Sequence, residues 1–179
     1  MPLPAESHTV RICSATRLGD NGEVLSTCFA PHVGSDLRTA DGYLSVHWLE
    51  YLGRGTFPEC LARLREYLLN SPVAGEYKPS RKGKLAVLHC ETVSQSTLQN
   101  LNVPIDFAHM PRLDNVASSI SVTEDGKVVI GVAPEQAANN GQALDPHSGL
   151  FTIPEEAAHQ LAVQQQLARL VVHSEPGII

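Results

Sequence analysis

The stretch "KLAVLHC", Lys84 to Cys90, is a continuous apolar run near the middle of the chain. Seven residues are too few for a typical helix, and the apolar residues from Leu85 to Leu88 follow one another without the polar alternation that would mark a solvent-facing side. Short apolar runs of this kind are typical of strands that are covered above and below. The pattern therefore predicts a strand buried on both faces of a sheet.

The segments on either side of this run predict further regular structure. Thr56 and Glu59 have the spacing of a capping box and Pro58 suits a first turn, so we expect a helix from residue 56 to about Asn70. Downstream, residues 94–101 predict a short polar helix and "VPIDFAH" predicts another strand. The apolar stripe of the helix at 56–70 is formed by Cys60, Leu61, Leu64 and Leu68.

Two hairpins are expected from their turn residues. "HTVRICS" (8–14) and "GEVLSTCFA" (22–30) flank the sequence Gly-Asp-Asn-Gly at 19–22, which supplies the positive φ angles of a tight turn. "SSISVTEDGKVVIGV" (118–132) has the same form around Asp125-Gly126. Both patterns predict paired antiparallel strands.

The stretch "DGYLSVHWLEYLG" (41–53) holds the single tryptophan and two of the four tyrosines. Ser45 is a suitable cap and Gly53 a suitable end, so we expect a short helix whose inner face carries Trp48, Leu49 and Leu52. Packing leaves three side chains unexplained. The candidate binding residues are Tyr43, His47 and Tyr51.

The end of the chain predicts an Ala- and Gln-rich helix from Pro154 to about Val172. Strands and helices alternate irregularly along the chain, which favours the α+β class. We expect a single domain over 1–179, with a mainly antiparallel or mixed sheet, helices packed on one side, and flexible ends at 1–6 and 174–179.

Composition restricts the classes of partner. Thirteen Lys and Arg against nineteen Asp and Glu give a net charge of −6, which is the wrong sign for a general nucleic-acid binder. The segment "KPSRKGK" (78–84) is basic, but it lacks the interleaved aromatics that stack on bases, so a solvated loop is the favoured interpretation and nucleic-acid contact the alternative.

No signal-peptide pattern or apolar run of about 20 residues occurs, which predicts a protein without membrane contact. The four cysteines lack CxxC spacing, so we expect free thiols in the cytoplasm.

Phosphate-loop and GxSxG motifs are absent from the sequence, and nothing in it calls for a cofactor. Strand ends nevertheless collect chemically active side chains, and the candidate catalytic residues are Cys90, Asp106, His109 and Arg112. Adjacent strands would bring His89, Asp106 and His109 together as ligands of zinc or iron. We favour isolated histidines satisfied by hydrogen bonds, and therefore expect no metal.

Two functions follow from these observations. The first is a small accessory or interaction module without catalysis, which binds a protein partner or a second copy of itself through exposed aromatic residues. The alternative is a hydrolase or metal-dependent enzyme with its site at Cys90, Asp106 and His109.

Overall fold

The computed structural model describes residues 1–30, 43–70, 79–110, 120–122, 128–130, 146–151 and 157–178. A six-stranded sheet forms its centre, and every strand pair in it is antiparallel. In spatial order the strands are β4 (Asp106–His109), β7 (His147–Phe151), β2 (Leu44–Trp48), β1 (His8–Cys13), β3 (Lys84–His89) and β8 (Val171–Pro176). A separate hairpin pairs β5 (Ile120–Val122) with β6 (Val128–Ile130).

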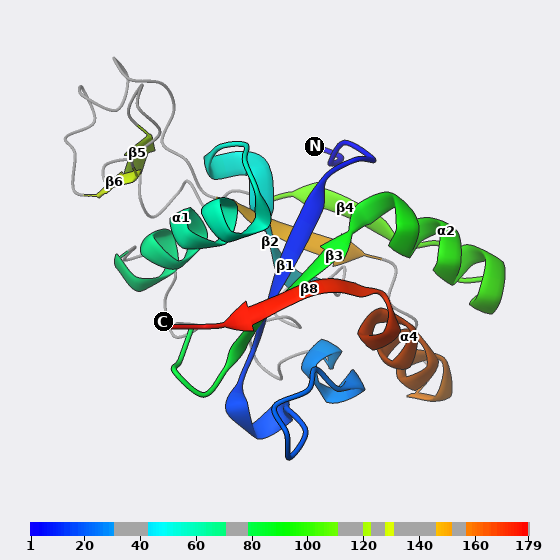
Figure 1. The fold of residues 1–179 in the computed structure, drawn as a ribbon. Coiled ribbons are helices and arrows are strands. Elements are labelled where there is room, and N and C mark those ends of the chain that lie inside the picture. The colour runs from blue at the N-terminus through cyan, green and yellow to red at the C-terminus, as the bar shows by residue number, and fades with distance from the viewer. Residues whose placement is uncertain are drawn as a thin grey trace.

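Helices cover the sheet from both sides (Figure 1). One side carries α1 (Phe57–Asn70), and the other carries α2 (Cys90–Leu101) and α4 (Ala157–Arg169). The expected α+β class with an antiparallel sheet is confirmed, and the helices occupy two faces rather than one. Short 3-10 turns connect the strands at η1 (Ala15–Arg17), η2 (Ser26–Phe29) and η3 (Leu49–Leu52).

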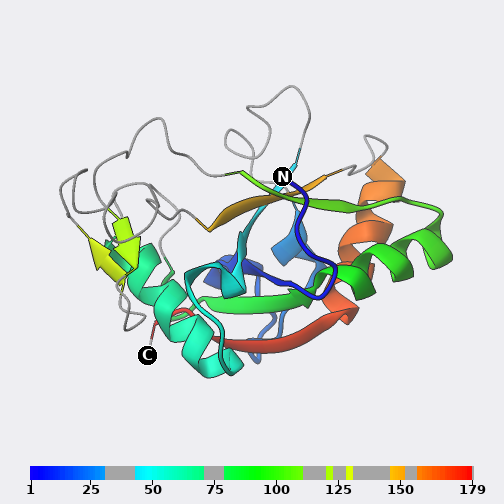
Figure 2. The same cartoon turned by 90° about the horizontal axis from the view of Figure 1, so that it is seen from above.

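The strand predicted from "KLAVLHC" is β3, and it is buried on both faces as expected. Leu85 and Val87 pack into the core beneath α1, while Ala86 and Leu88 pack into the core beneath α2 and α4. Successive side chains of a strand point to opposite faces, so one continuous apolar run supplies both cores. Figure 2, viewed from above, shows the sheet lying between these helices.

The predicted helix over 45–53 is wrong. Residues 44–48 form β2, which pairs with β1 on one side and β7 on the other, and only residues 49–52 turn into η3. The hydrogen bonds of two neighbouring strands outweigh the weak local helical preference of five residues. Gly53 ends the turn with a φ of 132°, a conformation that favours glycine.

The predicted hairpin between 8–14 and 22–30 is also wrong. The tight turn exists, since Gly19 N–H donates to Glu23 O at 2.9 Å and Gly22 has a φ of 74°. Its strands do not pair beyond one bridge between Leu18 and Val24, because β1 is already paired with β2 and β3. The chain after the turn forms η2 instead.

Most of the other predicted helices and strands are present. α1, β3, β4 and the β5–β6 pairing are confirmed, and α2 begins at Cys90, four residues earlier than predicted. The Glu59 carboxylate accepts hydrogen bonds from the backbone and hydroxyl of Thr56 at 2.8 and 2.9 Å, as a capping box predicts.

Residues near both ends of the chain make hydrogen bonds with the sheet. α4 ends at Arg169 and the chain continues as β8, which pairs with β3 through Pro176. At the other end, His109 N–H donates to Met1 O at 2.8 Å. Within the described residues, no helix is long and apolar enough to cross a bilayer.

A core substitution tests this arrangement. Leu88 is fully buried in β3, so Leu88→Ala should lower the free energy of unfolding by about 2–5 kcal/mol. Leu98 on α2 is 51% exposed, and Leu98→Ala should change it by less than about 0.5 kcal/mol. Urea unfolding measures both values, and similar losses for the two variants would contradict the assignment of β3 to the core.

Candidate functional site

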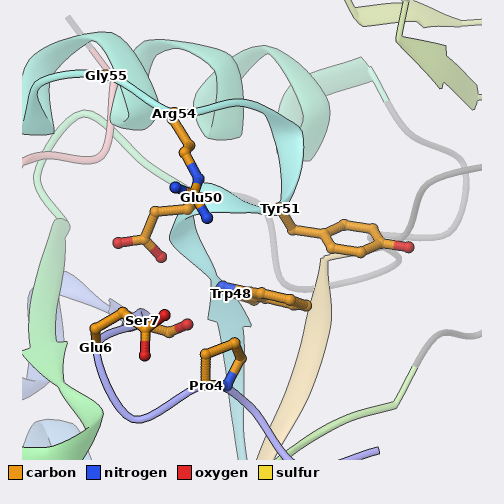
Figure 3. Close-up of a pocket in the computed structure, with 8 residues that line it drawn as sticks. All are labelled: Pro4, Glu6, Ser7, Trp48, Glu50, Tyr51, Arg54 and Gly55. Atoms are coloured by element: carbon orange, nitrogen blue, oxygen red, sulfur yellow. The ribbon is translucent and has the colours of Figure 1, made fainter.

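A pocket of about 460 Å³ opens between η3 and the N-terminal segment. Glu50 and Arg54 enter it from η3 and the loop that follows, and Glu6 and Ser7 enter from the opposite side (Figure 3). Trp48, at the end of β2, lies between the two sides. The full lining comprises Pro4, Glu6, Ser7, Trp48, Glu50, Tyr51, Arg54 and Gly55, and we call it the Glu50 pocket.

His8 holds the Glu50 carboxylate in place. The backbone N–H of His8 donates to both carboxylate oxygens at 3.0 and 3.2 Å, and His8 Nδ1 lies 2.6 Å from Glu50 Oε1. Burial raises the pKa of Glu50, but the hydrogen bonds from the ring and backbone of His8 outweigh burial, so its pKa lies below the usual value. Glu50 therefore places a fixed negative charge in the pocket.

Three rings pack against one another at the pocket, and two of them, Trp48 and Tyr51, belong to its lining. Trp48 and Tyr51 have centroids 5.1 Å apart, and His109 lies 4.4 Å from Tyr51 and 5.7 Å from Trp48. The Tyr51 ring points away from the Glu50 carboxylate (Figure 3). Trp48 Nε1 is buried and has no hydrogen-bond partner among the described residues. Rings next to a carboxylate favour amphipathic or cationic ligands.

Behind Glu50, histidines from two strands contact Phe57 of α1, and a histidine from the strand between them packs against one of these two. His8 on β1 lies 4.9 Å from both Phe57 and His89, measured between ring centroids, and His173 on β8 lies 5.4 Å from Phe57. His173 Nε2 is 2.9 Å from the Glu175 carboxylate, which also pairs with Arg65 of α1. These contacts fasten α1 to the end of the sheet that carries the pocket.

A second polar arrangement lies on the α1 side of β2 and β7. Ser45 Oγ is 3.1 Å from His147 Nε2, and His147 Nδ1 is 2.8 Å from the carbonyl oxygen of Met110. A carbonyl only accepts hydrogen bonds, so Nδ1 carries the proton of the neutral ring. Nε2 is then an acceptor, and the Ser45 hydroxyl donates to it. Sequence reasoning missed this pair because 102 residues separate its members.

The structure separates the three predicted binding residues, Tyr43, His47 and Tyr51. Tyr43 and His47 lie near His147 at centroid distances of 5.9 and 6.1 Å, on the α1 side of β2. Tyr51 lies with Trp48 and His109 at the Glu50 pocket instead. The expected grouping depended on a helix at 45–53, but the chain leaves the sheet after Trp48, so Tyr51 lies in η3 and is carried away from the face that Tyr43 and His47 share.

The predicted catalytic residues are also separated. Cys90 follows β3 and His109 ends β4, and β1, β2 and β7 lie between these strands, so roughly 19 Å separates them. Asp106 and His109 point to opposite faces of β4, because their positions differ by three. Arg112 lies outside the described residues. The described members do not form one cluster.

Thiol and metal chemistry find little support in this part of the molecule. Burial raises the pKa of the Cys90 thiol to about 12, and burial also raises the pKa of Cys60. His89 accepts a hydrogen bond from the backbone of Thr92 as the cap of α2, which occupies its Nδ1. Among the residues with described positions, no group of three or more His, Cys, Asp or Glu is arranged to hold a metal ion.

No protein-family model, curated protein or solved structure matches this chain. Trp48 and Tyr51 could be recognised in the sequence as part of an aromatic cluster, whereas no sequence pattern marked Glu50, which lies in the same stretch. Its partner His8 is 42 positions away, which no local pattern reveals.

The Glu50–His8 pair makes folding stability depend on pH. Because the pKa of Glu50 is lowered by folding, its carboxylate contributes stability above the unfolded pKa of about 4.3, and this contribution is lost as the pH falls through the folded value. The melting temperature of Glu50→Gln should therefore lie below that of the wild type at neutral pH, and the gap should shrink as the pH is lowered through about 4.

Thermal melts at closely spaced pH values measure this gap. Glu66→Gln, an exposed position on α1, removes the same charge and is the matched control. A gap for Glu50→Gln that stays constant between neutral and acid pH would show that the carboxylate is not stabilised by His8.

Proposed function

We propose that the chain is an interaction module whose Glu50 pocket receives a lysine or arginine side chain from a partner protein. The observation that carries this proposal is the fixed Glu50 carboxylate in a pocket that Trp48 and Tyr51 also line. A cation gains both from the carboxylate and from the negative face of an aromatic ring. No cofactor is needed for such a role.

The charges around the pocket support a basic occupant. Glu6 adds a second carboxylate to the lining, and the whole chain carries a net charge of −6, which attracts basic partners over longer distances. Arg54 is exposed and its side chain points toward Glu50 (Figure 3), from where its guanidinium can turn to donate hydrogen bonds to the backbone carbonyls of the same partner segment. The partner is then a peptide segment that presents one basic side chain.

The single tryptophan gives a direct test, because Trp48 lines the pocket and is the sole source of indole fluorescence. A capped glycine peptide with one lysine or arginine should change the Trp48 emission in a saturable way, and the same peptide with norleucine should not. Glu50→Gln should weaken the binding roughly tenfold, through loss of the carboxylate charge.

Glu66→Gln is again the control and should bind like the wild type within about twofold. Equal binding of the lysine and norleucine peptides, or unchanged binding by Glu50→Gln, would refute a basic occupant. Sedimentation over a range of protein concentrations tells a separate partner from a second copy of the chain.

We propose hydrolysis at Ser45 as a second candidate function, on a different observation. The Ser45 hydroxyl donates to His147 Nε2, and His147 Nδ1 donates to the Met110 carbonyl. Ser45 is therefore placed as a nucleophile, His147 as its base, and the Met110 carbonyl as the group that orients the ring. Ser45 is partly exposed, whereas His147 is buried. This arrangement supports the hydrolase alternative with residues other than those expected from the sequence.

A fluorophosphonate probe, which forms a covalent bond with activated serines, tests this second function. The wild type should be labelled and Ser45→Ala should not, and His147→Gln should reduce the labelling rate by at least roughly a hundredfold. Ser148→Ala removes a neighbouring buried hydroxyl on β7 and should leave labelling intact. A wild-type chain that is not labelled, or labelling that persists in Ser45→Ala, would exclude this role.

A further inference from the structure

Two cysteines meet where β1 ends. Cys13 is the last residue of β1 and Cys28 lies in η2, and both are 1% exposed and belong to the same core cluster. Cys28 Sγ donates to the carbonyl oxygen of Arg17, four residues after Cys13, at 3.2 Å, and the two cysteine side chains interact although fifteen positions separate them in the sequence. Cys60 lies in the core beneath α1, and Cys90, although it belongs to the same cluster as Cys13, lies at the opposite end of β3, where α2 begins.

Two arginines hold η2 against this end of the sheet. Arg11 Nε donates to the carbonyl oxygen of Cys28 at 3.2 Å, and Arg17 donates to the carbonyl oxygen of Thr27 at 3.2 Å. Both guanidinium groups therefore lie close to the two sulfur atoms. Positive charge next to a thiol favours its thiolate form, and the thiolate is the nucleophile in cysteine chemistry.

The two thiols are unequal. The hydrogen bond from Cys13 lowers the pKa of Cys28, and the N–H of Leu25 and the charges of Arg11 and Arg17 lower it further, although burial opposes them. The same sulfur–sulfur hydrogen bond, together with burial, raises the pKa of Cys13. Cys28 is thus the thiol that ionises first, and Cys13 is the one that keeps its proton longer.

We propose that Cys13 and Cys28 are a redox pair that forms a disulfide when the folded chain meets hydrogen peroxide. The Cys28 thiolate attacks one peroxide oxygen, which forms an S–O bond, breaks the O–O bond and releases hydroxide. Cys13, losing its proton, then attacks the sulfur of the resulting sulfenic acid, which forms the S–S bond and expels the hydroxyl group as water. In sum, two thiols and one peroxide give one disulfide and two water molecules.

The disulfide would fasten η2 to β1 by a covalent bond. Because η2 also packs against α4, the linkage would restrain the whole layer on this side of the sheet. A cross-link across a loop of this length stabilises the native state mainly by restricting the unfolded chain. We therefore expect the melting temperature of the oxidised chain to rise by roughly 5 °C or more.

Peroxide treatment of the folded full-length chain, followed by thiol counting in denaturant, tests the proposal. The four thiols of the wild type should fall to two, and peptide mapping should find Cys13 joined to Cys28. The double variant Cys60→Ser/Cys90→Ser should fall from two thiols to none. Four remaining thiols, or a linkage that includes Cys60 or Cys90, would overturn the proposal.

The single variants test the order of events. Cys13→Ser should stop at a sulfenic acid on Cys28, which dimedone traps, whereas Cys28→Ser should give no trapped sulfenic acid on Cys13. The trapping rate in Cys13→Ser should rise with pH as the thiolate forms. Trapping on Cys13 would reverse the assigned roles, and a wild-type mapping result decides the linkage even where a serine variant fails to fold.

Discussion

The buried guanidinium of Arg11 joins three segments that are distant in the sequence. It is 3% exposed and donates to the carbonyl oxygens of Cys28, Ala30 and Ser45 at 3.2, 3.2 and 2.6 Å. A buried cation is costly unless its donors are satisfied, so these carbonyls have to stay where the guanidinium reaches them. The positions of η2 over β1 and of β2 beside β1 both depend on this one side chain.

On the other face of the same strand, His8 has a comparable role. Its backbone and ring hold Glu50, and Glu50 in turn fixes η3 at the point where the chain leaves β2. Gly53 then turns the chain back into α1, where Arg63 donates to the Gly53 carbonyl at 2.9 Å. The Glu50 pocket is the space that this sharp exit from the sheet leaves beside the N-terminal segment.

The sequence predicted those elements whose signals are local. The capping box of Thr56 and Glu59 and the apolar run of β3 each need fewer than ten neighbouring residues to be recognised. β2, β7 and β8 were missed because a short strand gains most of its stability from partners far along the chain, as in the pairing of His47 with His147. The same reason explains the sites: Trp48 and Tyr51 were visible, but Glu50 with His8, and Ser45 with His147, are pairs that only folding creates.

Strand alternation also explains how one short element serves two sites. Ser45 and His47 face the α1 side of β2, whereas Trp48 faces the other side and lines the Glu50 pocket. A ligand in the pocket is separated from Ser45 by the backbone of β2, whose hydrogen bonds to β1 and β7 hold it rigid. Glu50 lies in η3, beyond the end of β2, whereas Ser45 lies within β2 beside β7, so substitutions at the two positions act at separate places, and binding at one site and chemistry at the other can be assigned independently.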